Sequence, residues 1–323
     1  MSERYSRQMR LPEVAEAGQA RLAAAEVGVI GAGGLGCAVL EYLTAAGVGR
    51  LTIVDHDRVE ESNLHRQPLY RMCDLGRPKA EAARATLGAL NPQVRIDALA
   101  ERLTPANAPG LVDGVDVIVD AADSFAATYV LSDACQRAGK PLVSASVLGL
   151  AGYVGAFCGG APSYRAVFPE LPRQAGSCAE SGVLGTAVGV MGTLQAHLTL
   201  ALILELEPPV LGRLISIDFR TLHIGGFSFA GAAEPVDALA FIAPAEVAAS
   251  DLVIDLRDLA EAPVSPFPSA LRLGVEALEN GEPRLPSGQR IVLCCRSGAR
   301  AWRAARALAA RGHRHLVLIA LGE

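Results

Sequence analysis

The sequence lacks several features that would direct it to common functional classes. Its 323 residues contain no Cys-x-x-Cys pair, no run of lysines and arginines, and no charged N-terminal segment followed by an apolar one. A structural zinc site needs four ligands at recognisable spacing, so we expect no zinc. Seven cysteines without paired spacing and the lack of a secretion signal predict a cytoplasmic protein. The net charge of -5 provides no electrostatic footprint for nucleic acid or a membrane surface.

A glycine-rich turn follows the first predicted strand. Val27 to Ile30 has the apolar pattern of a short buried strand, and Gly31-Ala32-Gly33-Gly34-Leu35-Gly36 then leads into an apolar helix that ends near Gly47. Glycines at a helix start let backbone amides approach phosphate oxygens. A second strand, Leu51 to Val54, delivers Asp55, whose carboxylate can accept hydrogen bonds from ribose hydroxyls. These features alone fit an NAD site as well as an ATP site.

Two cations favour a nucleoside triphosphate. Arg66 lies within Ser62-Asn63-Leu64-His65-Arg66-Gln67, and Lys79 follows Pro78, which suits the first position of a helix. A structural cation is disfavoured at a helix start. Fixed positive charges there would stabilise a departing pyrophosphate, because its negative charge grows in the transition state. We therefore predict an ATP site.

A carboxylate at the end of another strand predicts a magnesium site. Asp123 follows the apolar strand Val115 to Val119, and carboxylates at strand ends on the side of a glycine-rich turn can hold magnesium. Alternatively, Asp123 caps the helix that begins near Phe125. Asp120 could take that capping or turn role instead.

Together these motifs carry a family resemblance. The first 225 or so residues resemble the ubiquitin-activating-enzyme-like adenylyltransferases of bacterial sulfur transfer, which activate the small subunit of molybdopterin synthase and the thiamine sulfur carrier. The resemblance implies a Rossmann-like α/β domain with a mostly parallel sheet. It also implies ATP-dependent adenylation of the C-terminal Gly-Gly carboxylate of a ubiquitin-like sulfur carrier, with release of pyrophosphate. The matching segments are Arg4 to Gln8, Gly31 to Gly36, Asp55, Ser62 to Gln67, Gly76 to Lys79, Asp123 and Ser177 to Val183.

The resemblance assigns roles to individual residues. Asp55 would bind the ribose, Asp123 would organise magnesium, and Arg7 would reach the triphosphate of the other protomer in a homodimer. No side chain need act as a general base, because a carboxylate is already a nucleophile at neutral pH. The implied nucleotide-site residues are Gly31, Gly33, Gly34, Gly36, Asp55, Asp57, Ser62, Asn63, Arg66, Gln67, Lys79, Asp123 and Ser124.

The chain departs from the family pattern at two places. Ser163-Tyr164-Arg165-Ala166 stands where relatives carry the first of two zinc-binding Cys-x-x-Cys pairs, and Ser124 stands where they usually have Asn. We expect activity to be retained with altered nucleotide contacts. Val183 to Leu204, 22 residues without a formal charge, is long enough to span a bilayer. Glycines, Gln195 and His197 interrupt it and relatives have a buried helix there, so we expect no membrane span.

The cysteines of this first part fall into two groups. Cys37, Cys135 and Cys158 lie in apolar contexts, and we expect them to be buried without a chemical role. Cys178 lies in an irregular segment between Gly176 and Ser181 and matches a catalytic cysteine of some relatives. An exposed thiol there could attack an acyl adenylate or a persulfide, or it could be an idle loop thiol.

The residues from Asp251 onward predict a second small α/β unit of strand, loop, helix and strand. Its loop Cys295-Arg296-Ser297-Gly298-Ala299-Arg300 resembles the active-site loop of rhodanese-like sulfurtransferases, and Asp255 and Arg257 match that domain's Asp-x-Arg. Backbone amides and the positive helix end would stabilise a thiolate or persulfide on Cys295, with Arg300 closing the anion cradle.

A second register of this loop is possible, because Cys294 has the spacing to Arg300 of cysteine-dependent phosphatases. Alternation along the strand places Cys294 within it and Cys295 first in the loop, so we prefer Cys295 as sulfur carrier. At 73 residues the unit is short, and its folding would depend on packing against the first domain. A vestigial module is the alternative.

The sequence thus predicts two domains, residues 1–240 for adenylation and residues 241–323 for sulfur transfer. The predicted function is adenylation of a Gly-Gly sulfur carrier followed by persulfide transfer from Cys295, with a sulfur donor such as a cysteine desulfurase. Two other functions remain open: a partner-binding protein derived from an adenylyltransferase, and an NAD-dependent oxidoreductase. The carrier and its pathway (thiamine, molybdopterin, tRNA or another product) are not specified by the sequence.

Overall fold

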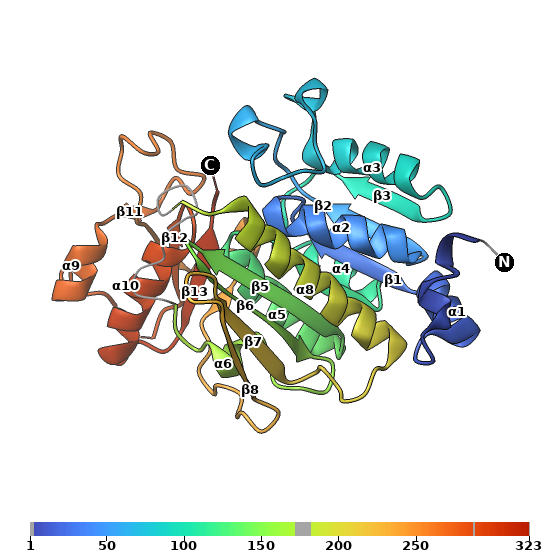
Figure 1. The fold of residues 1–323 in the computed structure, drawn as a ribbon. Coiled ribbons are helices and arrows are strands. Elements are labelled where there is room, and N and C mark those ends of the chain that lie inside the picture. The colour runs from blue at the N-terminus through green and yellow to red at the C-terminus, as the bar shows by residue number, and fades with distance from the viewer. Residues whose placement is uncertain (1–2, 172–181, 287, 323) are drawn as a thin grey trace.

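The structure, a computed structural model, describes residues 3–171, 182–286 and 288–322. Its described residues form two β-sheets (Figure 1). The first sheet has eight strands in the order β3-β2-β1-β4-β5-β6-β7-β8, and the second has five in the order β11-β10-β12-β13-β9. The predicted α/β class with a mostly parallel first sheet and a second small α/β unit is confirmed.

The N-terminal half of the first sheet is parallel and alternates with helices. Its strands are β1 (Glu26–Ile30), β2 (Arg50–Val54), β3 (Arg95–Leu99), β4 (Val117–Asp120) and β5 (Pro141–Leu148). Its helices are α2 (Gly34–Ala46), α3 (Lys79–Leu90), α4 (Ala108–Asp113) and α5 (Phe125–Ala138). The strand order reverses direction between β1 and β4, and ligands of open α/β sheets bind at the carboxyl ends of strands at such a switch point.

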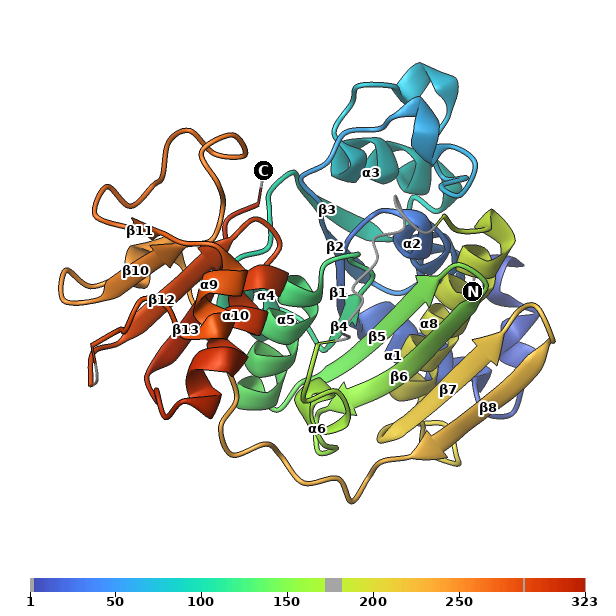
Figure 2. The same ribbon diagram turned by 90° about the vertical axis from the view of Figure 1, so that its left-hand side faces the viewer.

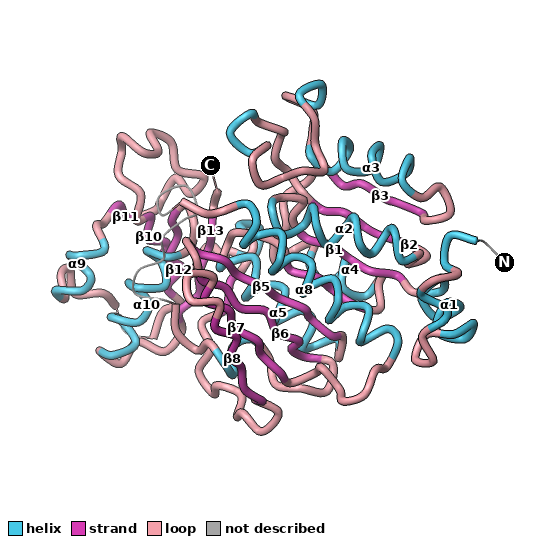
Figure 3. The backbone as a smooth tube through the Cα atoms, viewed as in Figure 1, coloured by secondary structure: helices cyan, strands magenta, loops and turns pink. Residues whose placement is uncertain are grey.

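The C-terminal half of the first sheet is antiparallel, which the sequence did not lead us to expect. It continues from β5 through β6 (Ala151–Cys158), β7 (Arg213–Asp218) and β8 (His223–Ser228). Helix α8 (Gly185–Leu204) lies beside α2 and packs on β5 and β6 (Figures 1 and 3). By length and composition alone α8 could cross a membrane, but 56% of its apolar window is buried inside the protein.

Short elements complete the first part. They are α1 (Ala15–Ala24), α6 (Tyr164–Val167) and the 3-10 turns η1 (Glu3–Tyr5), η2 (Gln8–Arg10), η3 (Glu61–Asn63) and η4 (Met72–Asp74). Ser163, at the position of the missing cysteine pair, caps α6, and its backbone N–H and hydroxyl both donate to Glu234 at 2.6 Å. Cys37, Cys135 and Cys158 are buried, as their apolar contexts predict.

The second sheet is parallel throughout. It contains β9 (Ala240–Phe241), β10 (Leu252–Asp255), β11 (Leu271–Arg272), β12 (Ile291–Cys295) and β13 (Leu316–Ala320), with η5 (Pro244–Glu246), α9 (Val275–Asn280) and α10 (Ala299–Ala310). The predicted boundary between residues 240 and 241 falls inside β9, so a division by sheet would lie between β8 and β9.

The hydrophobic residues lie on both sides of the first sheet. One cluster packs under α2, α3 and α8, and the other lies under α4 and α5. Alternate residues of β4 belong to opposite clusters, Val117 and Val119 to the first and Ile118 to the second. The second cluster continues into the second sheet through α5 and α10, which lie side by side (Figure 2). Helix α5 is therefore shared between the two sheets.

Candidate functional site

The glycine turn joins β1 to α2 at the switch point of the first sheet. Ala32 in this turn donates its backbone N–H to Asp55 Oδ2 at 2.7 Å, and Asp57 N donates to Asp55 Oδ1 at 2.8 Å. Burial raises the pKa of Asp55, while the Ala32 hydrogen bond and the charge of Lys79 act to lower it. Asp55, the residue predicted to bind the ribose, is therefore held against the turn by the backbone N–H of Ala32.

Two glycines of the turn are required by backbone packing. Gly31 has φ +95°, and a Cβ built on it would lie 2.6 Å from the Ala121 carbonyl oxygen. A Cβ on Gly36 would lie 2.0 Å from the Gly31 carbonyl oxygen. At Gly33 the nearest such atom is Gln67 Nε2 at 3.8 Å, so there the backbone leaves room beside the helix start. The close packing of the turn and the opening for a ligand thus depend on different glycines.

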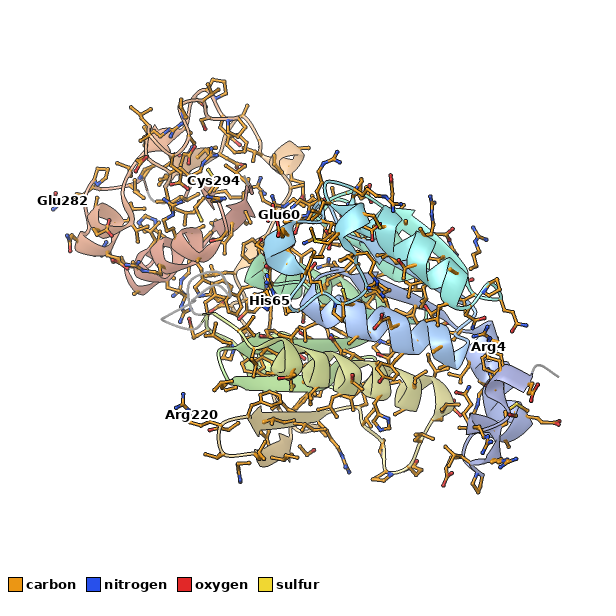
Figure 4. All side chains as sticks on the ribbon, turned by 45° about the horizontal axis from the view of Figure 1, so that its top comes forward. Arg4, Glu60, His65, Arg220, Glu282 and Cys294 are labelled. Carbon is orange, nitrogen blue, oxygen red and sulfur yellow. The ribbon has the colours of Figure 1, made fainter. Side chains whose placement is uncertain are left out.

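The segment from Ser62 to Gln67 packs against the start of α2. A Cβ on Gly34 would lie 3.4 Å from the Arg66 carbonyl oxygen and 3.6 Å from Arg66 Cγ. The Arg66 guanidinium donates to the Ser62 carbonyl at 3.2 Å, and Asn63 donates to the Ser62 hydroxyl at 3.2 Å. Gln67 is buried, and the described residues provide no hydrogen-bond partner for its Oε1. Figure 4 shows this segment with His65 and Glu60 labelled.

Lys79 is buried beside the turn, with 7% of its side chain exposed, and its Nζ lies 2.9 Å from Asp57 Oδ2. Burial acts to raise the pKa of Asp57, but the hydrogen bond and charge of Lys79 outweigh it and hold that pKa below its usual value. The structure thus brings the predicted cation to the site in an ion pair. Lys79 is the first residue of α3, so Pro78 precedes the helix instead of occupying its predicted first position.

Asp123 lies three residues after the carboxyl end of β4 and two residues before the first residue of α5. Its carboxylate is exposed, and the described residues provide it with no hydrogen bond or ion pair. Hard carboxylate oxygens suit magnesium, which keeps several waters and is commonly held by one or two carboxylates together with substrate phosphates. The residues present fit such an ion. The alternative role of helix cap is not observed, because Ser124 holds the N-cap position.

Three polar residues that we did not assign to the site organise it. Tyr70 donates its hydroxyl to the Ala32 carbonyl at 2.7 Å and approaches the Lys79 carbonyl at 3.3 Å, joining the turn to α3. Asp120 accepts hydrogen bonds from Thr128, Ser144 and the Ala122 backbone N–H. Gln195 on α8 donates to the backbone carbonyls of Asp120 and Val143. From the sequence, a turn role for Asp120 was one of the alternatives. Nothing in the sequence indicated a role at the site for Tyr70 or Gln195.

Arg7 lies at the opposite end of α2 from the glycine turn. Its neighbour Gln8 donates to the Ala46 carbonyl at 2.9 Å, and the ring of Tyr5 contacts Gly47, the residue that follows α2. Thirteen residues of α-helix separate these contacts from the turn, about 20 Å of axial length. Arg7 therefore does not join the glycine turn of its own chain.

Cys295 in the second sheet faces two backbone amides at the start of α10. Its Sγ lies 3.1 Å from Gly298 N and 3.4 Å from Ala301 N, the arrangement expected for a loop that stabilises a thiolate. The strand continues one residue further than predicted, so Cys295 is the last residue of β12 and is fully buried. Cys178, the other predicted sulfur-handling cysteine, lies outside the described residues.

The charged residues around Cys295 are already paired. Arg300 donates to the Leu256 carbonyl at 3.0 Å and to Glu261 at 2.5 Å, so its guanidinium is shared between the predicted anion cradle and a carboxylate. Asp255 is buried; burial acts to raise its pKa, but hydrogen bonds from Arg257 and Ser265 outweigh this and hold the pKa low. Burial raises the pKa of the alternative nucleophile, Cys294, to about 12.

Comparison with known proteins places the first sheet in a family. Residues 5–235 match the model of the ThiF family. A sulfur carrier protein adenylyltransferase from Thermus thermophilus is 46% identical over 235 residues, which cover 69% of this chain and 87% of that protein. The bovine (Bos taurus) adenylyltransferase and sulfurtransferase MOCS3 is 49% identical over 218 residues, 67% of this chain and 48% of that protein. The chain thus spans about half the length of the MOCS3 proteins it matches.

The fold has solved counterparts. A crystal structure of E. coli MccB with MccA-N7isoASN aligns with a TM-score of 0.62 at 23% identity, covering 73% of this chain and 74% of that one. At this identity the likeness concerns the fold alone. The family match spans more than half of the chain, including the glycine turn, Arg66, Lys79 and Asp123. The chain belongs to the ThiF family.

Proposed function

We propose that the chain adenylates the C-terminal Gly-Gly carboxylate of a ubiquitin-like sulfur carrier, with ATP as co-substrate and magnesium as cofactor. The observation that carries this proposal is the position of Arg66, Lys79 and Asp55 around one glycine turn at the switch point. The pyrophosphate bridge of a dinucleotide such as NAD is bound at a helix start and needs neither Arg66 nor Lys79. A departing pyrophosphate does, because fixed cations stabilise its growing charge.

The reaction needs positioning more than acid-base chemistry. A carrier carboxylate oxygen would attack the α-phosphorus of ATP, the bond to the bridging oxygen would break, and pyrophosphate would leave. The amides at the start of α2 would bind phosphate oxygens, and Lys79, released from Asp57 or shared with it, would lie against the triphosphate. Magnesium held by Asp123 would neutralise phosphate charge.

A homodimer would complete the site. Helix α8 has no charged residue over its 20 positions, and Leu184 and Val190 at its start are 55% and 45% exposed. A two-fold axis across the paired α2 and α8 would reverse the direction of α2 in the second copy. Arg7 of the partner subunit would then lie near the glycine turn, the end of α2 that its own Arg7 cannot reach.

Sulfur would reach the adenylate through Cys295. Its thiolate would attack the outer sulfur of a donor persulfide, and the donor thiolate would leave. The resulting terminal sulfur would attack the adenylate carbonyl and expel AMP. A second thiol, for which Cys178 is the candidate, would then cleave the sulfur-sulfur bond and release the thiocarboxylate, leaving a protein disulfide for a cellular dithiol to reduce. The two amides directed at Cys295 Sγ support this role.

ATP-pyrophosphate exchange with candidate carriers ending in Gly-Gly tests the adenylation step. Lys79→Met should lower exchange by at least about 100-fold, the size of one transition-state charge contact. Arg84→Ala, an exposed cation on the same helix, is the matched control and should leave exchange unchanged. Exchange that survives Lys79→Met, or that fails with every Gly-Gly carrier, would contradict the proposal. Displacement of a bound nucleotide probe by NAD and not by ATP would favour the oxidoreductase.

Mixing two inactive variants tests the role of Arg7. In a heterodimer of Arg7→Ala and Lys79→Met chains, one of the two sites would have both residues intact if Arg7 acts across the dimer. After subunit exchange of equal amounts, about a quarter of wild-type activity should return, since half of the dimers are mixed. No recovery in demonstrably mixed dimers would mean that Arg7 does not act in the site of the other subunit.

Mass spectrometry tests the sulfur-transfer step. It should find a gain of about 32 Da, one sulfur atom, on Cys295 after incubation with thiosulfate or a cysteine desulfurase.

A further inference from the structure

The Cys295 side chain is buried, although the loop that follows it is exposed. The side chain has 0% exposure, whereas Arg296 and Ser297, the next two residues, are exposed. Gly298 closes the loop between the two sheets: a Cβ built on it would lie 2.7 Å from the Phe241 ring and 3.5 Å from Ala126 Cβ on α5. Cys295 belongs to the hydrophobic cluster that continues into α5. The first domain therefore packs against the loop that holds the thiol.

The contact between α10 and the first domain is held by a small group of polar and aromatic residues. Trp302 packs on Tyr129 of α5 with ring centroids 5.0 Å apart, and its Nε1 donates to Glu170 Oε2 at 3.4 Å. Arg306, one turn further along α10, forms an ion pair with Glu170 Oε1 at 2.5 Å. We call Trp302, Arg306, Tyr129 and Glu170 the seam.

The seam combines a buried ring contact between Trp302 and Tyr129 with a neighbouring cavity and an exposed ion pair. A cavity of about 170 Å³ lies beside it, lined among others by Arg165, Glu170, Trp302 and Arg306. The Arg306–Glu170 pair is half exposed on both sides, and exposed pairs contribute about 1 kcal/mol or less. Opening of the seam with each sheet still folded would need less free energy than global unfolding, as local opening generally does.

Cys294 provides an internal contrast. It lies next to Cys295 in β12, but its side chain faces the other side of the sheet, in a cluster with Val253, Val292 and Ile319. Its Sγ donates to the Ile254 carbonyl at 3.5 Å. All of these residues belong to the second sheet, so parting the seam leaves Cys294 covered.

We propose that Trp302, Glu170 and Arg306 are positioning residues that hold the Cys295 loop closed against α5, so that sulfur chemistry at Cys295 requires the second sheet to undock from the first. The place of this opening in sulfur transfer rests on the function proposed above. The sealing itself does not, because it is a property of the thiol's surroundings. In the docked state Gly298 of the Cys295 loop lies against Ala126, close to the end of α5 that follows Asp123.

Alkylation of the full chain with iodoacetamide, followed by mass spectrometry, measures the sealing without ATP, carrier or sulfur donor. Trypsin releases both cysteines in one peptide, Ile291 to Arg296, in which fragment ions distinguish Cys294 from Cys295. In the wild type, Cys295 should react at least tenfold more slowly than the exposed Cys73. Equal rates for Cys295 and Cys73 would overturn the proposal.

Two variants and a control test the seam. Glu170→Ala removes the ion pair and the Trp302 hydrogen bond and should accelerate Cys295 up to about fivefold, because 1 kcal/mol in the opening equilibrium is a factor of about five. Trp302→Ala should accelerate it more than tenfold. Glu279→Ala removes the ion pair that Glu279 makes with Arg303, also on α10 but inside the second module, and should change nothing.

The rate at Cys294 separates undocking from unfolding. Acceleration of Cys295 alone, with Cys294 and Cys37 still protected, supports the proposal. Equal acceleration of Cys294 and Cys295 means that the second module unfolds, and no acceleration in either seam variant means that the seam does not cover the thiol. Both results would overturn it. Failure of ATP-pyrophosphate exchange would leave these labelling results unchanged, so the two proposals fail independently.

Discussion

Replacement of Asp120 by Asn should reveal a free-energy cost hidden in the first domain. Asp120 is buried with 1% exposure, and this burial raises the pKa of its carboxyl from 3.8 to about 6, against the lowering effect of the Thr128 and Ser144 hydrogen bonds. The nearby charge of Asp123 raises it further. The folded protein therefore holds an ionised carboxylate at neutral pH in a place that disfavours it.

The sign of the pH dependence follows from this rise. Between pH 4 and pH 6 the folded state binds more protons at Asp120 than the unfolded state does, so its contribution to stability is full below about pH 4 and is lost as pH rises through 6. A rise from 3.8 to about 6 corresponds to about 3 kcal/mol. Asn has the same shape without the charge, and the Thr128 and Ser144 hydroxyls can reorient to accept from its amide.

Urea unfolding of the wild type and Asp120→Asn at several pH values measures the effect. The difference in unfolding free energy should move in favour of the variant by about 2 kcal/mol from pH 4 to pH 7, because the unfolded carboxyl is already partly ionised at pH 4. Taking the difference cancels the titration of other groups. Thr128→Val, which removes a hydrogen bond but keeps the carboxylate, should retain the wild-type pH slope or steepen it. A pH-independent difference between Asp120→Asn and the wild type would refute the reasoning.

Three further predictions concern the packing of the first domain and its magnesium ligand. Gly36→Ala should lower the unfolding free energy by more than about 3 kcal/mol because its Cβ would meet the Gly31 carbonyl, while Gly88→Ala, in an open position of α3, should gain about 0.5–1 kcal/mol by urea unfolding. Arg165→Ala should lower the unfolding free energy by about 3–5 kcal/mol in the same assay, because it leaves the Asp133 carboxylate without its buried cation. A loss below about 1 kcal/mol would show that water takes the place of the guanidinium. Asp123→Asn should raise the magnesium concentration for half-maximal pyrophosphate exchange about tenfold or more, and an unchanged magnesium dependence would exclude it as the ligand.

The parts of the site that sequence predicted are those carried by local pattern. The glycine turn and the strand that leads into Asp55 lie where spacing places them, and α3 starts one residue after the predicted Pro78, since each depends on a few consecutive residues. The same holds for α10 (Ala299–Ala310), which is the helix of the predicted unit of strand, loop, helix and strand.

What sequence did not predict depends on residues far apart in the chain. The ion pair of Lys79 with Asp57 joins positions 22 apart, and Gln195 reaches Asp120 from 75 residues away. The antiparallel half of the first sheet escaped prediction because its strand pattern does not state which strand is the neighbour. The burial of Cys295 also needed the tertiary contact, since its own loop indicates an accessible thiol.

The position of Arg7 at the far end of α2 has a consequence for how activity depends on enzyme concentration. In the proposed homodimer a single chain would contain every proposed residue and still lack a complete site, because about 20 Å of helix separates Arg7 from its own glycine turn. Turnover per chain should therefore fall when the protein is diluted below the dissociation constant of the homodimer, although the separated chains remain folded. Turnover that is constant across such a dilution would mean that one chain works alone.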